Sequence, residues 1–156
     1  MTVVMELPAT TLVSQSGERV EAGGQGAQWT KGIAISSRWA AETVKRVLAL
    51  TSLPHDWDSY GSPPPSQVAI FASYGLLNSI PKTVFEDLPI PFVAPVSGGG
   101  IQLEWNVGAR ELELHVMPDG STQFLKTLGG EALDEGPLRL SPIATRELFA
   151  WLTSTR

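Results

Sequence analysis

The chain has 156 residues, of which 42% are hydrophobic and only 17% are charged, against roughly 25% charged residues in typical soluble domains. Its net charge of −5, with eleven scattered lysines and arginines, argues against direct DNA or RNA binding, because phosphate recognition needs a basic patch. It contains no cysteine, which excludes disulfide bonds, thiolate metal sites and cysteine nucleophiles.

The composition of the first 32 residues is typical of a segment without regular structure. Residues 14–28 are rich in serine, glycine and glutamine, and such a stretch buries too little apolar surface to offset its ordering entropy. We therefore expect an irregular or mobile N-terminal arm over residues 1–32 and a single domain over residues 33–156. The start also lacks a basic stretch followed by an apolar core, and no run approaches about 18 apolar residues. We expect a cytoplasmic protein that does not enter a membrane.

Two helices are predicted between residues 36 and 81. Ser36 and Ser37 open the first, since a serine N-cap accepts a hydrogen bond from an otherwise unpaired amide, and Pro54 limits its end. Ser66 opens the second helix, and Pro81 stops it. The apolar residues expected to face the core are Ala40, Val44, Val47 and Leu48 in the first helix and Val68, Ile70, Phe71, Tyr74 and Leu77 in the second.

The loop between these helices, residues 55–65, carries two carboxylates and two aromatic side chains. Asp56 and Asp58 could serve as acid and base, or as ligands of a hard cation. The alternative, which we favour, is that both aspartates cap turns while Trp57 and Tyr60 pin the loop to the core.

From residue 91 the apolar pattern changes from helical spacing to alternation. Strands over residues 101–107 and 110–116 flank Gly108-Ala109, a two-residue turn with glycine first that suits a type II′ hairpin. The turn Pro118-Asp119-Gly120 leads into a third strand over residues 121–127. Residues 92–96, before three consecutive glycines, are predicted to form a fourth strand.

Alternation also fixes the register of the first hairpin. If Val107 pairs with Arg110, every apolar side chain of the two strands lies on one face, which is what specifies a register. The apolar pairs are then Trp105 with Leu112, Leu103 with Leu114, and Ile101 with Val116.

A C-terminal helix follows the strands. Ser141 caps it and Pro142 takes its first position, and the residues expected to face the core are Ile143, Leu148, Phe149 and Leu152. The predicted fold class is α+β, with a three- to four-stranded antiparallel β-meander and two or three helices packed on one face.

The same register predicts a band of carboxylates on the other face of the sheet. Glu104 lies opposite Glu113, and like charges directly across strands are destabilising. The remaining polar pairs are Gln102 with His115 and Asn106 with Glu111. Glu104, Glu111 and Glu113 could dock a basic partner or, with His115, hold a divalent metal. The interpretation we favour is a solvated sheet face on which Lys126 or Arg110 relieves the repulsion.

The sequence contains no recognisable catalytic motif. It has no G-x-S-x-G elbow, P-loop, H-E-x-x-H or EF-hand spacing. Gly98-Gly99-Gly100 precedes a predicted strand, so it lacks the helix N-terminus that would receive a phosphate, and we expect a turn into the meander. We predict no cofactor and no metal, and the sequence offers no evidence for an enzyme.

Two segments resemble a known group of proteins. The first is Trp57-Asp58-Ser59-Tyr60-Gly61-Ser62. The second, after prolines and a helix, begins with Gly99-Gly100-Ile101-Gln102-Leu103-Glu104-Trp105 and continues with Arg110-Glu111-Leu112-Glu113-Leu114 and Pro118-Asp119-Gly120. The chain is similar over about residues 54–127 to small uncharacterised bacterial proteins with a W-D-G/S-Y-G-A/S loop and a G-G-I-x-L-E-W strand. The resemblance implies a bacterial or phage cytoplasmic context and a unit of loop, helix and meander. It implies no activity.

These observations favour a non-enzymatic protein-interaction or accessory domain, with an antitoxin-like or defence-associated component among the options. We expect a protein partner, with a basic surface as one option, because the chain has few charges and an acidic sheet face. Three aromatic residues expected at the surface near turn-rich loops, Trp29, Trp57 and Tyr60, favour partner contacts as well. The residues expected to contact it are Trp57, Asp58, Tyr60, Glu104, Glu111 and Glu113. The alternative is a small metal-binding or hydrolytic domain that uses the loop of His55, Asp56 and Asp58. A homo-oligomer joined edge to edge is a third hypothesis.

Overall fold

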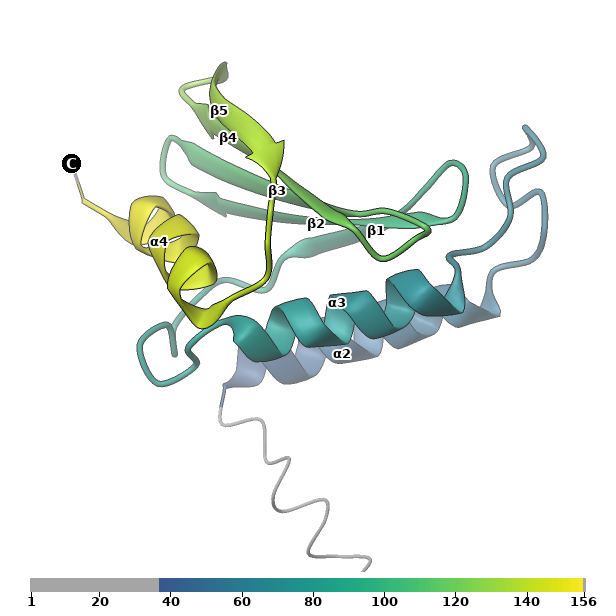
Figure 1. Ribbon diagram of the computed structural model, residues 1–156, viewed down its shortest axis with the longest axis horizontal. Coiled ribbons are helices and arrows are strands. Elements are labelled where there is room, and N and C mark those ends of the chain that lie inside the picture. The colour runs from purple at the N-terminus through teal and green to yellow at the C-terminus, as the bar shows by residue number, and fades with distance from the viewer. Residues whose placement is uncertain (1–36, 156) are drawn as a thin grey trace, which may run out of the picture. The chain divides into compact units, whose positions relative to one another are not determined.

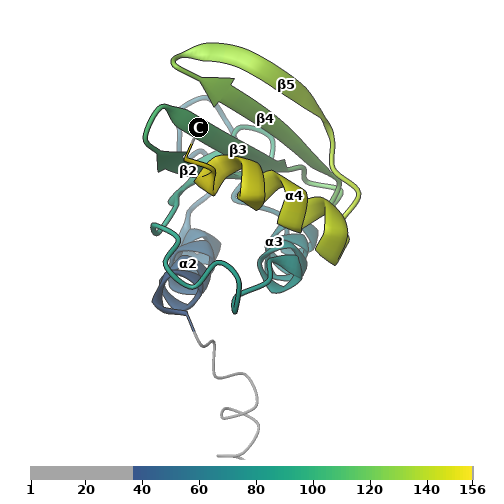
Figure 2. The same cartoon turned by 90° about the vertical axis from the view of Figure 1, so that its left-hand side faces the viewer.

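The computed structural model describes residues 37–155, in which helices pack on one face of an antiparallel sheet (Figure 1). The strands pair in chain order and are β1 (Phe92–Val96), β2 (Gly100–Val107), β3 (Arg110–Val116), β4 (Thr122–Leu128) and β5 (Glu131–Pro137). The helices are α2 (Arg38–Ala49), the short 3-10 helix η2 (Leu50–Ser52), α3 (Gln67–Ser79) and α4 (Pro142–Thr153). Figure 2 shows α2 and α3 side by side beneath the sheet, with α4 beside β3.

The predicted α+β class is confirmed, but the sheet has five strands where three or four were predicted. The additional strand is β5, which is mostly exposed and has no alternation of apolar residues. It follows Gly129 and Gly130, whose φ angles of 60° and 85° are those of a type I′ hairpin turn. The two glycines were therefore the sequence signal for this strand.

The predicted register of the first hairpin is confirmed from Val107 opposite Arg110 to Ile101 opposite Val116. Gly108 has a φ of 62° and Ala109 is not in the positive-φ region, as a type II′ turn requires. One face of β2 and β3, called the inner face below, lies beneath the helices. Its buried side chains are Ile101, Leu103, Trp105, Leu112, Leu114 and Val116; Val107 and Arg110, at the hairpin end of the same face, are partly exposed.

Trp105 lies at the centre of the core. Its ring makes edge contacts with Phe149 of α4, at a centroid distance of 5.0 Å, and with Trp39 of α2, at 6.3 Å. The Trp39 indole N–H donates a buried hydrogen bond of 2.8 Å to the carbonyl oxygen of Phe85. The sheet, two helices and the loop after α3 are thus joined through three aromatic rings and one hydrogen bond.

The predicted starts of the helices are confirmed. Ser66 and Ser141 accept hydrogen bonds from backbone amides in the first turns of α3 and α4. Ser37 precedes α2, but its side chain makes no capping hydrogen bond. The predicted N-terminal arm and Trp29 lie outside the described residues. None of the helices in residues 37–155 combines the length and apolarity that crossing a membrane needs.

The predicted buried faces of the helices are only partly right. Four residues expected in the core are exposed instead: Leu48 (49%), Val68 (52%), Phe71 (69%) and Ile143 (73%). In α3 the cause is composition, because that helix has no charged residue and is apolar on nearly every side. Its packing against the sheet, and not its periodicity, selects the buried set of Ala69, Ile70, Ser73, Leu76 and Leu77.

Candidate functional site

The face of the sheet opposite the helices, called the outer face below, holds all three predicted glutamates. Strand pairing places its side chains in cross-strand rows. The rows are Ala94–Gln102–His115–Gln123–Pro137, Phe92–Glu104–Glu113–Leu125–Glu135 and Asn106–Glu111–Thr127–Ala132. No lysine or arginine occupies a position in these rows. Within residues 37–155 the helices pack on the inner face and leave this acidic face without a helical layer.

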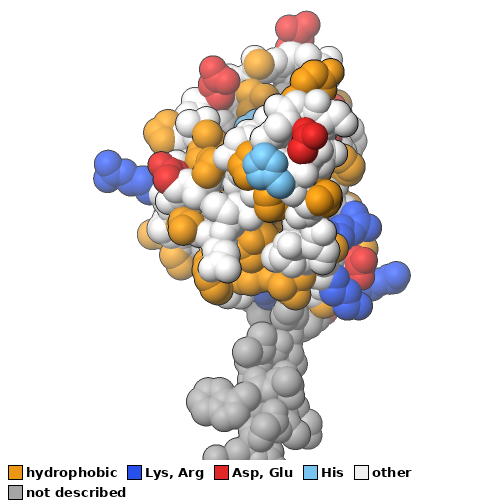
Figure 3. All heavy atoms as spheres, turned by 90° about the vertical axis from the view of Figure 1, so that its right-hand side faces the viewer, with side chains coloured by type: hydrophobic (Ala, Val, Ile, Leu, Met, Phe, Trp, Pro, Cys, Tyr) orange, Lys and Arg blue, Asp and Glu red, His pale blue; other side chains and the backbone are white. Residues whose placement is uncertain are grey.

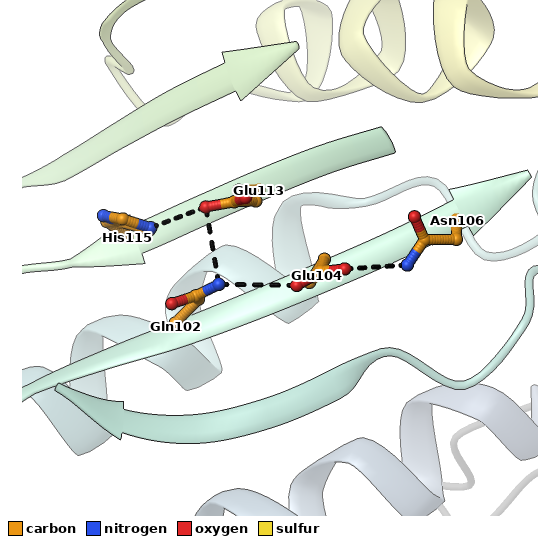
Figure 4. Close-up of polar contacts among 5 residues, drawn as sticks. All are labelled: Gln102, Glu104, Asn106, Glu113 and His115. Atoms are coloured by element: carbon orange, nitrogen blue, oxygen red, sulfur yellow. Dashed lines mark hydrogen bonds and ion pairs between the residues drawn. The ribbon is translucent and has the colours of Figure 1, made fainter. Parts of the chain in front are cut away.

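A chain of polar contacts runs between the opposed carboxylates of Glu104 and Glu113 (Figure 4). Gln102 Nε2 lies between them, 3.4 Å from Oε2 of each. Asn106 Nδ2 donates to Glu104 Oε1 at 2.8 Å, and His115 Nε2 lies 3.0 Å from Glu113 Oε2. The carboxylates of Glu104 and Glu113 are therefore contacted by two side-chain amides and an imidazole, and not by a lysine or arginine.

The expectation that Lys126 or Arg110 relieves this repulsion is wrong. Strand pairing places both on the inner face of the sheet. There the Lys126 ammonium lies 3.3 Å from Asp134 Oδ2, and both cations lie over the ring of Trp151, at 5.5 Å and 5.7 Å from its centroid. The negative charge of the outer face is consequently not balanced by these two residues.

The loop between η2 and α3 is organised by Asp58. Its Oδ1 accepts the backbone N–H groups of Tyr60 (2.9 Å) and Ser62 (3.2 Å), and its Oδ2 accepts the hydroxyls of Ser62 (2.6 Å) and Ser97 (3.0 Å). These hydrogen bonds, the one from the Ser62 hydroxyl above all, hold the pKa of Asp58 well below its ordinary value of 3.8. Asp56 Oδ1 accepts the N–H of Gly61 at 2.6 Å. Both aspartates therefore close turns, as predicted.

The two aromatic side chains of this loop do not pin it to the core, contrary to prediction. Trp57 is half-buried and donates its indole N–H to the carbonyl oxygen of Pro63, within the same loop, at 3.0 Å. Tyr60 is 92% exposed. Asp56 and Ser59 have φ angles of 64° and 61°, in the left-handed region that residues with a Cβ rarely occupy. The loop therefore adopts an unusual backbone conformation that hydrogen bonds to Asp56 and Asp58 hold in place, and the Tyr60 side chain is exposed at its surface.

The segments that carry the family resemblance meet at one end of the sheet. Asp58 reaches Ser97 in the β1–β2 turn, and the Ser66 amide donates to the Gly99 carbonyl oxygen at 3.0 Å. The Ser66 hydroxyl donates to the carbonyl oxygen of Pro118, in the β3–β4 turn, at 2.7 Å. Figure 3 faces this end and shows hydrophobic and histidine side chains exposed on it. The contacts of Ser66 with Pro118 and of Ser97 with Asp58 were missed because nothing in the local sequence indicates contacts this distant.

The glycines before β2 form the turn that was predicted, which the Gly99 amide closes by donating to the Val96 carbonyl oxygen. Gly98 and Gly99 have φ angles of 90° and 96°, which glycine adopts without strain. Gly100 begins β2, and a Cβ there would lie only 2.8 Å from the carbonyl oxygen of Val116. The glycines thus permit the close approach of backbone segments.

Replacing Asp58 with asparagine should lower the melting temperature in a way that depends on pH. Because the pKa of Asp58 is depressed in the folded chain, its ionised form contributes stability above about pH 4 and loses it as the pH falls towards the folded value. We expect a steady gap between wild type and Asp58→Asn from about pH 7 to pH 5, narrowing below about pH 4. Thermal unfolding followed by circular dichroism at each pH measures this difference in melting temperature, with Glu147→Gln as the control. A gap of constant size down to about pH 2 would contradict the assignment.

The metal-binding alternative requires several ligands to converge. Among residues 37–155 no group of three or more histidine, aspartate and glutamate side chains is placed to hold a metal ion. Asp56 and Asp58 direct carboxylate oxygens to groups within the loop and to Ser97. Their arrangement is explained by turn formation without a ligand.

The comparisons with known proteins return no relative. No protein-family model matches the chain, and neither a curated protein nor a solved structure matches it. The resemblance carried by the Trp57–Ser62 and Gly99–Trp105 segments therefore stays a prediction. Two surfaces are available for function: the outer face and the loop of residues 55–65, called the Tyr60 loop below.

Proposed function

We propose that the chain is a non-enzymatic protein-interaction or accessory domain of a bacterial or phage system, such as an antitoxin-like or defence-associated component. The main support for the proposal is that Tyr60 is exposed on a loop whose backbone is held by hydrogen bonds. A side chain of this size that is 92% exposed has no role in the core, yet the backbone beneath it is held by hydrogen bonds to Asp56 and Asp58. Tyrosine is enriched among the residues that dominate binding energy at protein interfaces.

The rigidity of the loop supports binding in a second way. Association costs free energy for every loop that becomes ordered on binding, so a loop already fixed before contact binds more tightly. Asp58 fixes the backbone on both sides of Tyr60 and ties it to Ser97 of the β1–β2 turn. The left-handed conformations of Asp56 and Ser59 belong to the same arrangement, and unfavourable backbone conformations are concentrated at functional sites.

The charge of the outer face indicates the kind of partner. Glu104, Glu111 and Glu113 lie on one face without a lysine or arginine in the same cross-strand rows. An acidic surface attracts basic partners during encounter and disfavours acidic ones. We therefore propose a partner with a basic contact surface, which meets the Tyr60 loop and the outer face.

Affinity purification of the tagged full chain from its native cells tests the proposal. Wild type, Tyr60→Ala and Ile143→Ala are compared by quantitative mass spectrometry; Ile143 is the control because it is an apolar side chain of α4 that is 73% exposed. We expect a stoichiometric partner with wild type and Ile143→Ala and at least a tenfold loss with Tyr60→Ala, in line with about 2 kcal/mol for an aromatic hot spot. A lone chain, or a partner retained equally by Tyr60→Ala, would overturn the proposal.

A further inference from the structure

A shallow hollow of about 380 Å³ lies over β3, β4 and β5 beside the Glu113–His115 pair. Its lining includes His115, Gln123, Leu125, Glu135 and Pro137. Strand pairing explains this set, because His115, Gln123 and Pro137 share one cross-strand row of the outer face and Glu113, Leu125 and Glu135 share the next. The hollow thus combines an apolar floor with one carboxylate in its lining and a second in the adjoining row.

The two carboxylates flank the apolar floor. Glu113 and Glu135 each pair directly with Leu125, from opposite sides, so their backbones lie about 9.6 Å apart, two strand spacings. A long side chain with apolar methylenes and a cationic end has the matching chemistry, because its stem can cover Leu125 and Pro137 while its charge meets a glutamate. No lysine or arginine of the strands occupies the rows of this face.

Arginine fits this hollow better than lysine. A guanidinium is planar, is less strongly hydrated than an ammonium, and bonds to carboxylates through two parallel N–H groups. The hollow also offers the His115 imidazole, against which a planar cation can stack, and the Gln123 amide as an acceptor. An ammonium uses neither the stacking surface nor the paired geometry.

We propose that this hollow binds an arginine side chain of the partner protein. The source of the arginine rests on the proposed function, whereas the preference of the hollow for a guanidinium is a property of the isolated chain. Glu135 and Leu125 are the residues that this inference adds to the predicted contact surface.

The test is an amide-resolved NMR titration of the full chain with two capped tripeptides, acetyl-Gly-Arg-Gly-amide and acetyl-Gly-Lys-Gly-amide. We expect shifts centred on residues 123–125 and 135–137, with the arginine peptide binding about fivefold more tightly, since the planar guanidinium can donate two parallel hydrogen bonds to one carboxylate and an ammonium cannot. Glu135→Gln should remove this preference. Glu131→Gln, the same change on the same strand but paired with Leu128 on the inner face, should preserve it.

Equal affinities for the two peptides, shifts centred elsewhere, or equal effects of Glu135→Gln and Glu131→Gln would each overturn the inference. Circular dichroism melts of both variants check that folding is intact, which is expected because both side chains are exposed. The outcome is separable from that of the proposed function. A partner lost with Tyr60→Ala together with no arginine preference would reject the hollow alone, and an arginine preference without any partner would reject the proposed function alone.

Discussion

Replacing Trp105 with alanine is expected to lower the free energy of unfolding by about 3–5 kcal/mol, the range for removing a buried large aromatic side chain. Trp105 is completely buried and its ring contacts Trp39 and Phe149, so the substitution would leave a cavity where the sheet meets α2 and α4. Since whole domains are stable by only about 5–15 kcal/mol, this loss is a large share of the total free energy of unfolding. Urea denaturation followed by far-ultraviolet circular dichroism measures the change.

Trp105→Phe provides the matched control for this effect. The Trp105 indole N–H is buried and has no hydrogen-bond partner among the described residues, so phenylalanine removes no hydrogen bond and only part of the volume. We expect a loss of about 1–2 kcal/mol for Trp105→Phe, and under about 0.5 kcal/mol for Ile143→Ala at an exposed site. A loss below about 1.5 kcal/mol for Trp105→Ala would contradict the central position of this ring.

Glu104→Lys is expected to stabilise the fold and weaken partner binding at the same time. The new lysine faces Glu113 directly, so a repulsive cross-strand pair becomes an attractive one. Removing the repulsion and gaining the attraction each contribute about 0.2–1 kcal/mol to the free energy of unfolding. The same lysine places a positive charge in the surface proposed to meet a basic partner, and we expect at least a tenfold weaker Kd, since like-charge contacts in interfaces cost several kcal/mol.

Two measurements separate a docking surface from a merely solvated sheet face. Urea denaturation gives the stability of Glu104→Lys. Surface plasmon resonance, with the partner recovered by wild type immobilised, gives the Kd of this variant for the partner. Glu86→Lys makes the same change in net charge at an exposed position in the loop between α3 and β1. If Glu104→Lys is stabilised but binds no worse than Glu86→Lys, the outer face is solvated and takes no part in binding.

The sheet could be predicted from sequence because alternation and turn chemistry agree. Ile101 to Val107 and Arg110 to Val116 have one apolar face each, and Gly108 determines the turn between them, so a single register satisfies both strands. The opposition of Glu104 and Glu113 followed directly. β5 was missed because an edge strand with little burial needs no apolar pattern, and only its preceding glycines indicated it.

The helix faces and the loop could not be predicted in the same way. In α3 nearly every position is apolar, so the buried face depends on packing that the local pattern does not encode. The aspartates of the 55–65 loop were correctly assigned to turns, whereas the exposure of Tyr60 depends on where the rest of the chain lies. The contacts of Asp58 with Ser97, and of Ser66 with Pro118, span 39 and 52 positions, beyond any local signal.

The pairing of the strands in chain order has a consequence for how the chain folds. Every strand of the described sheet pairs with its neighbours in the sequence, and the turns between β2 and β3 and between β4 and β5 have two residues each. Closing such short loops costs little entropy, and proteins dominated by contacts between nearby residues fold faster than those with distant pairings. The meander can therefore assemble hairpin by hairpin, while the contacts of Trp105 with α2 and α4 join segments far apart in the sequence and complete the core later.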